Sequence, residues 1–291
     1  MTIVRSADKV WLITGCSSGL GRAIAKQVAS RGYRVAVTAR DVGSVKDLVA
    51  SYEGAARAFA LDVTDPTSVD RVVVDVTAHF GQIDVLVNNA GIGYFGSVEE
   101  SDERDVRRMF DVNLFGVGSM IKTVLPQMRQ RRSGHIVNVA SAGGIVAFPA
   151  VGYYNASKWA LLGLSEALQK EVQHLGIRVT VAAPSGLRVR QAAGDAHFEM
   201  PDTRYEDYVP TVGAIRHALI ESFGRQPGDP LLAGDAIVQA VESPESPFRL
   251  FLGRAAVKYA KQRAVELLHD ATVWEEISEA VDYEDARGEA L

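Results

Sequence analysis

The sequence has little of three features that mark other classes of protein. Its single cysteine, Cys16, excludes an intramolecular disulfide and favours a reducing compartment. No stretch approaches the roughly 18–20 consecutive apolar residues that a membrane-spanning helix needs. The first nine residues carry charges and no long apolar run, so we expect neither a signal peptide nor a membrane anchor. With a net charge of −5, nucleic acid and anionic lipid are not expected partners. These absences together predict a cytoplasmic protein.

The composition is that of a globular protein with a large core. Hydrophobic residues make up 47% of the 291 residues, which is too many for a disordered chain. We find no internal repeat and no low-complexity linker, so residues 1–291 are expected to form one domain. We expect no metal site.

Short apolar runs alternate with amphipathic ones through the first two thirds of the chain. This order predicts right-handed crossovers and an α/β fold, a Rossmann-type doubly wound parallel sheet in three layers. The expected strands are Val10–Thr14, Arg34–Ala39, Ala56–Leu61, Ile83–Asn88, Gly134–Ala140 and Ile177–Ala183. The expected helices are Leu20–Arg31, Val45–Tyr52, Thr67–Phe80, Asp102–Arg131 and Tyr153–Leu175.

The pattern changes after Pro184, where the sixth expected strand ends. Residues 185–228 are rich in Gly, Pro, Asp and Arg, which predicts an insertion that acts as a substrate lid. Residues 255–291 are charged and helical, which predicts a C-terminal extension. Further expected elements are a lid helix near Val209–Phe223, a helix at Asp235–Val241 and a strand at Phe248–Leu252.

A glycine-rich turn lies between the first expected strand and the first expected helix. Glycine permits a tight turn and lets a pyrophosphate approach the backbone without a Cβ in the way. The following helix N-terminus offers free N–H groups and the positive end of its dipole. The position of the turn therefore predicts a dinucleotide phosphate site, formed by Gly15, Ser17, Ser18, Gly19, Leu20 and Gly21.

The end of the second strand carries Arg40 where an acidic residue would select NAD(H). A guanidinium there can pair with a 2′-phosphate, so NADP(H) is favoured, with NAD(H) possible. The alternative is a solvated arginine whose charge Asp41 partly offsets.

Two later strand ends also bear on nucleotide binding. Asp62 and Val63 follow the third strand, where the carboxylate can accept from an adenine amino group or, alternatively, cap a helix. Asn89, Ala90 and Gly91 follow the fourth strand, where small residues leave room for the nicotinamide ribose; the alternative is an ordinary turn.

Tyr154 and Lys158 lie four residues apart on one helix face, and Ser141 lies thirteen residues before Tyr154. An ammonium and an oxidised nicotinamide beside a phenol both stabilise the phenolate, so we expect Lys158 and a bound cofactor to lower the pKa of Tyr154 from about 10 toward neutral pH. Such a group is a proton donor and acceptor suited to carbonyl and alcohol chemistry. Tyr153 points about 100° away from Tyr154 and is expected to line the substrate side or to pack.

With these residues the sequence resembles the short-chain dehydrogenase/reductase family, from about residue 9 to 184. The match comprises the turn Thr14–Gly21, the Asn88–Gly91 segment, Asn113 in Asn-Leu-Phe-Gly, Ser141, and Tyr-x-x-x-Lys at Tyr154–Lys158.

The resemblance implies a role for each matched residue. Tyr154 would be the general acid in reduction and the base in oxidation, and Ser141 would polarise the substrate oxygen. Lys158 would hold the nicotinamide ribose, and Asn113 would hold a water for proton relay. Pro184 and Gly186 would lie beside the nicotinamide. The family usually has a threonine where this chain has Val189, which puts recognition of the carboxamide in doubt. The resemblance also implies a homodimer or homotetramer built on long helices that include Tyr153–Leu175.

The expected substrate is a small carbonyl or alcohol, and an apolar one. The resemblance and the residue types place Ser141, Tyr154, Phe95 and Phe148 at its site, with Tyr94, Val146, Tyr153, Phe198 and Met200 on neighbouring segments. Two other functions stay open. One is an NAD(P)-binding regulatory protein without catalysis, and the other is an epimerase or dehydratase on the same fold.

Overall fold

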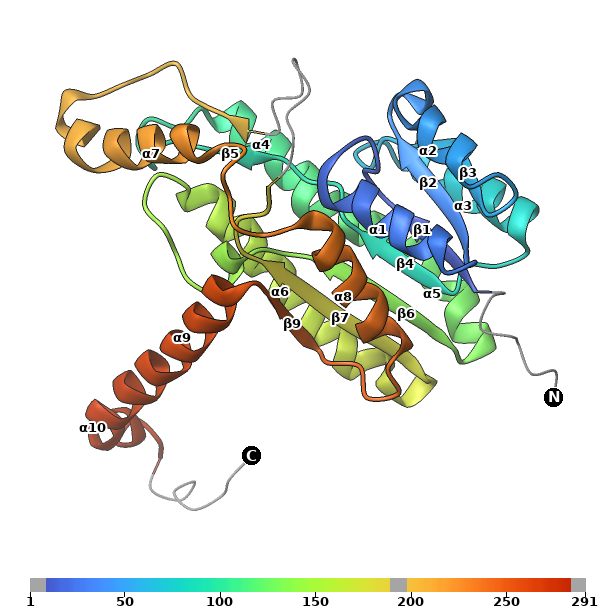
Figure 1. Cartoon of the computed structure of the whole chain (residues 1–291). Coiled ribbons are helices and arrows are strands. Elements are labelled where there is room, and N and C mark those ends of the chain that lie inside the picture. The colour runs from blue at the N-terminus through green and yellow to red at the C-terminus, as the bar shows by residue number, and fades with distance from the viewer. Residues whose placement is uncertain (1–8, 189–197, 284–291) are drawn as a thin grey trace.

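The computed structural model describes residues 9–188 and 198–283, and its centre is a seven-stranded parallel sheet (Figure 1). The strand order is β3-β2-β1-β4-β6-β7-β9, which confirms the predicted Rossmann-type fold. Because β1 pairs with both β2 and β4, the order reverses there, and ligands of such sheets bind outside the carboxyl ends at this point. The strands are β1 Val10–Ile13, β2 Arg34–Ala39, β3 Ala56–Ala60, β4 Val85–Asn88, β6 Gly134–Val139, β7 Ile177–Pro184 and β9 Arg249–Leu252.

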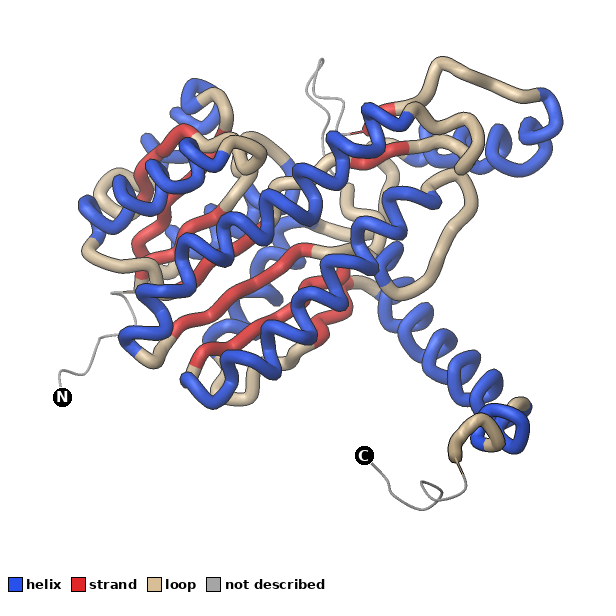
Figure 2. Tube along the Cα trace, turned by 180° about the vertical axis from the view of Figure 1, so that it is seen from behind, coloured by secondary structure: helices blue, strands red, loops and turns tan. Residues whose placement is uncertain are grey.

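Helices cover both faces of the sheet, which gives the predicted three layers (Figure 2). Successive strand residues point to opposite faces. Leu12 of β1 therefore joins one core cluster, while its neighbours Trp11 and Ile13 join the other. Burial on both faces explains why these strands are apolar without alternation. One layer holds α1 Gly19–Ser30, α2 Lys46–Ser51 and α8 Pro230–Glu242, and the other holds α3 Pro66–Phe80, α5 Gly116–Arg131 and α6 Gly152–Val172.

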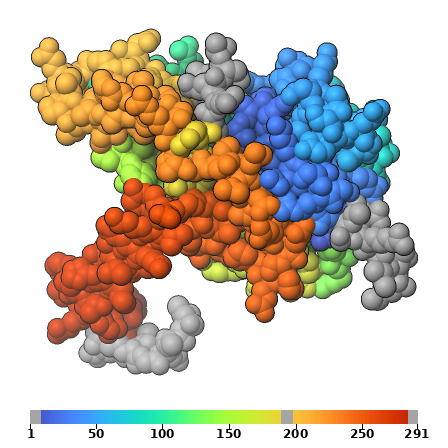
Figure 3. Space-filling model, viewed as in Figure 1, coloured from blue at the N-terminus to red at the C-terminus, as the bar shows by residue number. Residues whose placement is uncertain are grey.

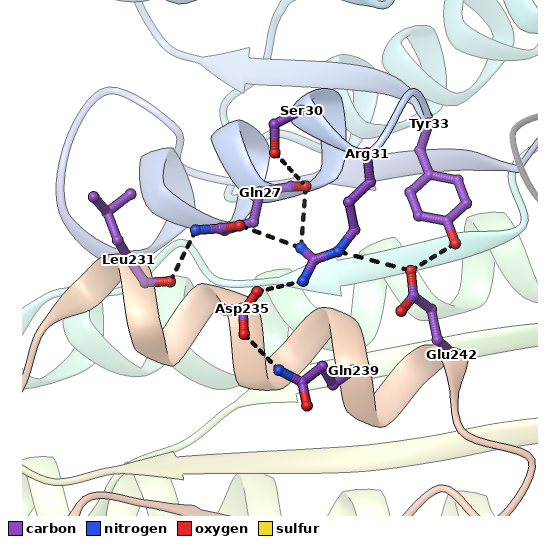
Figure 4. A network of polar contacts seen from close by, with 8 residues as sticks. All are labelled: Gln27, Ser30, Arg31, Tyr33, Leu231, Asp235, Gln239 and Glu242. Atoms are coloured by element: carbon purple, nitrogen blue, oxygen red, sulfur yellow. Dashed lines mark hydrogen bonds and ion pairs between the residues drawn. The ribbon is translucent and has the colours of Figure 1, made fainter.

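Helix α8 packs directly against α1, although about 200 residues separate them (Figure 4). A Cβ on Gly234 of α8 would lie 3.0 Å from the backbone nitrogen of Ile24, so the glycine permits the close approach. Polar groups then join the two helices along one side. Arg31 forms an ion pair with Asp235, and the hydroxyl of Tyr33 donates to Glu242 over 2.6 Å. These contacts hold in place the helix that follows the glycine turn.

Two expected helices differ from the structure. The stretch Asp102–Arg131 consists of α4 Glu103–Phe110, a π-helical segment η3 Asp111–Phe115, and α5. The segment carries Asn113, whose amide bonds the backbone of a different loop, and π-helical turns are frequent at functional sites. Helix α8 begins earlier than expected, because Asp229 caps it and Pro230 occupies its first turn.

A second, two-stranded sheet has no counterpart in the expected elements. Its strands β5 Gly93–Tyr94 and β8 Phe198–Glu199 pair in parallel across more than 100 residues. Each has two residues, too few for a periodic pattern. Within residues 185–228 the structure also has the helices η6 Glu206–Tyr208, η7 Val209–Gly213 and α7 Ala214–Ser222. Short helices earlier in the chain are η2 Val42–Val45, η4 Ala142–Gly144 and η5 Gln173–Leu175.

The chain ends in α9 Arg254–Val273 and α10 Glu275–Glu279, which project from the body of the protein (Figure 1). In residues 9–188 and 198–283, no helix has both the length and the apolar character needed to cross a membrane.

Candidate active site

The glycine turn is tied to the carboxyl end of β4 by two polar side chains. The hydroxyl oxygen of Thr14 accepts from the backbone N–H groups of Asn89 and Ala90, both over 2.9 Å. In return, the amide nitrogen of Asn89 donates to the carbonyl oxygens of Thr14 and Gly15 over 3.0 Å each. The ends of β1 and β4 are thereby held together at the switch point of the sheet.

Glycine is required at two positions of this turn. Gly15 has a positive φ of 70°, and a Cβ there would lie 2.9 Å from the Cα of Ala90. A Cβ on Gly21 would lie 2.3 Å from the amide nitrogen of Asn89 and from the oxygen of Gly15. Bare backbone in front of the α1 N-terminus fits the pyrophosphate of a dinucleotide. The other residues expected at the phosphate site differ in exposure. Ser17, Ser18 and Gly19 are partly exposed at the turn, whereas Leu20, in the first turn of α1, is buried in the core.

Cys16 lies in the same turn but is inaccessible. Its side chain is fully buried, and burial raises the pKa of the thiol to about 12. Because the thiolate is the reactive form, Cys16 acts as a small packing residue.

Arg40 is an exposed residue directly after β2. Within residues 9–188 and 198–283, its side chain makes no hydrogen bond and no ion pair. The neighbouring Asp41 uses its carboxylate to accept from the N–H of Gly43 over 2.8 Å. Arg22, in contrast, is bound to Asp47 and to the carbonyl of Ser44. Arg40 is therefore the more available cation at this edge.

The remaining residues of the expected nucleotide site take local roles. One oxygen of Asp62 accepts from the N–H and the hydroxyl of Thr64, over 2.9 and 2.7 Å. Asp62 does not cap the following helix, because Asp65 is the N-cap of α3, and the adenine contact of Asp62 stays a prediction. Val63 is buried in the core next to Gly116, where a Cβ would lie 2.8 Å from the oxygen of Val63.

Ser141, Tyr154 and Lys158 come together at the carboxyl end of β6. Ser141 follows this strand and accepts from the N–H of Gly143 over 3.1 Å. A Cβ on Gly143 would lie 3.6 Å from both the Ser141 hydroxyl oxygen and the Tyr154 ring, so the two side chains meet at this point. The ammonium of Lys158 donates to the oxygen of Val139 over 3.1 Å and lies 5.8 Å from the ring centre of Tyr154. Both side chains come from α6, at adjacent turns.

The pKa of Tyr154 in the protein alone depends mainly on burial. Burial raises the pKa of its hydroxyl, and the hydrogen bond with Ser141 opposes this without cancelling it. Burial also lowers the pKa of the Lys158 ammonium to about 8. A low-dielectric environment disfavours both charged forms. The protein groups alone therefore do not lower the pKa of Tyr154, because desolvation outweighs the effect of Ser141, and the lowering with a bound nicotinamide stays a prediction.

Asn113 approaches the same cluster from the π-helical segment. Its amide oxygen accepts from the N–H of Ile92 over 2.9 Å, and its nitrogen donates to the oxygen of Ile92 over 2.9 Å. A Cβ on Gly91 would lie 3.1 Å from this amide oxygen and 3.5 Å from the Lys158 nitrogen. Asn113 thus fixes the backbone beside Lys158, and its implied water-holding role stays a prediction.

The side chains expected at the substrate site are spread out. Phe95 is only 5% exposed, and its ring centre lies 4.5 Å from that of Phe198. Phe148 packs against Tyr259 of α9, with ring centres 5.2 Å apart. Tyr153 packs on the cluster of Tyr94, Val106 and Met109.

Pro184 and Gly186 mark the start of the insertion. Pro184 is the last residue of β7, and the oxygen of Gly186 accepts from Gly228 over 3.1 Å. Arg188 then donates to the oxygen of Gly228 over 2.7 Å, so the two ends of the insertion lie side by side. Val189 lies outside the described residues.

A chain of buried hydrogen bonds, which we did not predict from the sequence, joins β4, β6 and α6. The amide of Asn88 donates to Asn138 over 2.8 Å, and Asn138 donates to the hydroxyl of Ser165 over 2.9 Å. These residues belong to β4, β6 and α6, the elements that carry the nucleotide and proton-transfer residues. The sequence did contain a signal for this chain. Asn88 and Asn138 stand inside apolar strands, and a buried amide requires hydrogen-bond partners.

A family sequence model described as short chain dehydrogenase matches residues 9–197. The chain is also similar to curated oxidoreductases. It is 39% identical over 272 residues to Oxidoreductase BOA17 of Botryotinia fuckeliana, covering 93% of this chain and 98% of that protein. It is 34% identical over 270 residues to a 3-ketodihydrosphingosine reductase of Bacteroides thetaiotaomicron, covering 88% and 92%.

Solved structures agree in fold. A short-chain dehydrogenase from Streptomyces avermitilis has a TM-score of 0.87 at 40% identity, covering 94% of this chain and all of the other. A Burkholderia phymatum enzyme in complex with NAD has a TM-score of 0.77 at 25% identity, covering 89% and 95%. A metagenomic short-chain oxidoreductase in complex with NADP has a TM-score of 0.58 at 33% identity, covering 62% and 83%.

The Gly21→Ala variant tests the close contact at the turn. The added methyl meets Asn89 and the oxygen of Gly15, so we expect a loss of about 1–3 kcal/mol of stability and weaker nucleotide binding. Gly118→Ala is the matched control, because its Cβ would meet nothing within 4 Å; it should gain about 0.5–1 kcal/mol. Urea unfolding measures both, and equal effects of the two variants would contradict the contact.

Lys158→Met tests the burial of the ammonium. Between pH 8 and 10.5 the folded wild type holds a neutral Lys158, whereas the unfolded chain still binds the proton. Raising the pH through this window therefore stabilises the wild type relative to the variant, by about 3 kcal/mol. Below pH 8 both states are protonated and the difference should be constant. A difference in unfolding free energy that stays flat from pH 7 to 10.5 would show that Lys158 titrates normally.

Proposed function

The chain belongs to the short-chain dehydrogenase family, and from this premise we propose that it is an NADP(H)-dependent oxidoreductase that interconverts a carbonyl and a secondary alcohol. The observation that carries the proposal is the meeting of three side chains at the end of β6. The Lys158 nitrogen lies 5.8 Å from the ring centre of Tyr154, and a Cβ on Gly143 would lie 3.6 Å from both the Ser141 hydroxyl oxygen and the Tyr154 ring. The reductase of 3-ketodihydrosphingosine among its relatives supports a carbonyl substrate.

Each side chain of this cluster has a part in proton transfer. A nicotinamide, when bound, would supply the hydride for reduction of the carbonyl carbon and accept it back in oxidation. Tyr154 donates its hydroxyl proton to the substrate oxygen during reduction and takes it back during oxidation. Ser141 hydrogen-bonds the same oxygen and stabilises the charge that develops on it. Lys158 stabilises the phenolate that forms on Tyr154. The raised pKa of Tyr154 keeps the hydroxyl protonated, as a proton donor for reduction requires.

The nucleotide fits along the carboxyl edge of the sheet. Gly15, Ser17, Ser18, Gly19 and Gly21 would present backbone to the pyrophosphate at the α1 N-terminus. Asp62 and Val63 would flank the adenine, and Asn89, Ala90, Gly91, Pro184 and Gly186 the nicotinamide half. Solved relatives are in complex with NAD and with NADP, and the available Arg40 side chain favours the 2′-phosphate.

Residues 185–228 would act as a lid over an apolar substrate. Phe198 lies between Phe95 and Phe223, with ring centres 4.5 and 5.5 Å away. The buried Glu100 accepts from the N–H of Tyr205 in the insertion over 3.0 Å. Burial acts to raise the pKa of Glu100, but hydrogen bonds from the N–H groups of Tyr205 and Ser97 outweigh it and hold that pKa below its usual value.

The direct test of the function is consumption of reduced cofactor against a panel of aldehydes and ketones. NADPH and NADH are supplied separately, and the reverse reaction is followed with secondary alcohols and NADP⁺. Turnover of carbonyls with NADPH is the expected result. Tight nucleotide binding without turnover of any carbonyl or alcohol would point to the regulatory alternative.

Tyr154→Phe should lose roughly 10²–10⁴-fold in turnover, because the proton donor is removed. The ring remains, so NADPH binding measured by fluorescence should change little. Tyr153→Phe is the matched control, because the adjacent ring packs on Tyr94 and Met109 and should keep its turnover. If the Tyr154→Phe variant turns over like wild type, Tyr154 has no part in proton transfer.

Arg40→Asp should weaken NADPH binding roughly 10- to 100-fold, because a charged contact is lost and a repulsive carboxylate is added. NADH lacks the 2′-phosphate, so its dissociation constant should change little. The exposed Arg129 at the end of α5, changed to Asp, controls for net charge. Fluorescence titration with both nucleotides measures the effect, and an equal loss for both would rule out the phosphate contact.

A further inference from the structure

The C-terminal helix α9 leaves the body of the protein without covering any other element along most of its length (Figure 3). Ala256 is its one buried residue, and every residue from 264 to 283 is exposed. Most helical stability in proteins comes from packing of an apolar face, and the exposed part of α9 lacks such packing in the described residues. The length and isolation of α9 therefore require a partner surface.

One face of α9 is apolar without interruption. At 100° per residue, the residues Val257, Ala260, Ala264, Leu267, Leu268 and Ala271 occupy one sector about 100° wide, and Trp274 continues it. We call these seven residues the arm stripe. Leu267 is 53% exposed, Leu268 70% and Trp274 59%. Its members are spaced three and four residues apart, which is the spacing of the apolar residues at which paired helices meet.

The body of the protein binds only the first turns of the helix, where Ala256 is buried and two further side chains make contacts. Tyr259 packs on Phe148, and the Arg263 guanidinium lies 5.6 Å from the ring centre of Trp159. Tyr259 and Arg263 lie outside the arm stripe. The stripe is therefore available to a partner while the root of α9 stays attached.

The charges along the arm identify the partner. Residues 254–263 carry Arg254, Lys258, Lys261 and Arg263 and no acidic residue. Residues 264–282 carry six acidic residues and no Lys or Arg, namely Glu266, Asp270, Glu275, Glu276, Glu279 and Asp282. Within α9, cations near the N-terminus and acids near the C-terminus oppose the helix dipole, so this order lowers the stability of the helix alone. A partner of opposite charge order removes that cost.

We propose that α9 is a dimerisation arm that pairs antiparallel with α9 of a second copy of this chain. Antiparallel pairing brings the basic root of each arm to the acidic tip of the other. In this register Val257 faces Trp274 of the second copy, Ala260 faces Ala271, and Ala264 faces Leu267. Small residues then meet small or large ones in each layer, and Lys261 lies opposite Asp270 of the second copy. The same patch serves both copies, as a two-fold interface requires.

This surface is separate from the proton-transfer cluster, and the proposal does not depend on the proposed function. The acidic outer half argues against an anionic membrane as the partner. It also differs from the dimer or tetramer that the family resemblance implies, which would be built on α6.

Engineered cysteines test the register. Cys16 is buried, so introduced thiols are the reactive ones. The double variant Val257→Cys with Trp274→Cys should give a covalent dimer on mild oxidation. The double variant Val265→Cys with Val273→Cys is the control, because both residues are exposed on α9 but lie outside the arm stripe. Equal cross-linking of both variants, or of neither, overturns the proposal.

Charge reversal tests the partner. One variant carries Lys261→Glu and Arg263→Glu, and the other carries Asp270→Lys and Glu275→Lys. Each alone brings like charges together, so the arm contact should weaken at least roughly tenfold in sedimentation or native mass spectrometry. Mixing the two variants restores opposite charges at both ends and should give a heterodimer in preference to either homodimer. Unchanged association of the single variants, or no recovery on mixing, overturns the proposal.

Discussion

The burial of the Lys158 ammonium beside Tyr154 is the constraint on which the site depends. A buried cation is costly unless hydrogen-bonded, and the oxygen of Val139 at the end of β6 supplies one partner. Burial raises the pKa of Tyr154 and lowers the pKa of Lys158, so it favours the neutral form of each group. The protein groups therefore hold a protonated phenol in a dry environment, where a further positive charge has a large effect. In the proposed function, this cluster would act as a proton donor whose strength depends on the charge that binds next to it.

The parallel sheet brings the remaining residues to this point. All seven strands point the same way, so the ends of β1, β4 and β6 meet at one edge. Thr14 and Asn89 join the first two ends, and the chain from Asn88 through Asn138 to Ser165 joins β4, β6 and α6. On the other face, the contacts between α1 and α8 fix the helix behind the glycine turn. The glycine turn and the cluster of Ser141, Tyr154 and Lys158 are thus parts of one connected structure.

Local signals predicted the fold, and three of the expected site residues, Ser141, Tyr154 and Lys158, do meet in the structure. Buried strands lacked alternation, Asp65-Pro66 marked the start of α3, and four residues placed Tyr154 and Lys158 on one helix face. The predictions that failed concern features that depend on contacts between residues far apart in the sequence. The π-helical turn forms where Asn113 bonds Ile92, and β5 finds its partner β8 more than 100 residues later. The direction of the Tyr154 pKa shift depends on desolvation, which spacing does not reveal. Phe148 lies against α9, a helix whose direction no local pattern predicts.

The central claim is that a bound nicotinamide, together with Lys158, converts the buried Tyr154 hydroxyl into an acid and base of useful strength. The most direct measurement is the tyrosinate absorbance of Tyr154, taken as the difference between wild type and a Tyr154→Phe variant, titrated with and without NADP⁺. The account predicts a pKa above about 10 for the protein alone and a clear fall toward neutral pH with NADP⁺ bound. The same pKa under both conditions would contradict it.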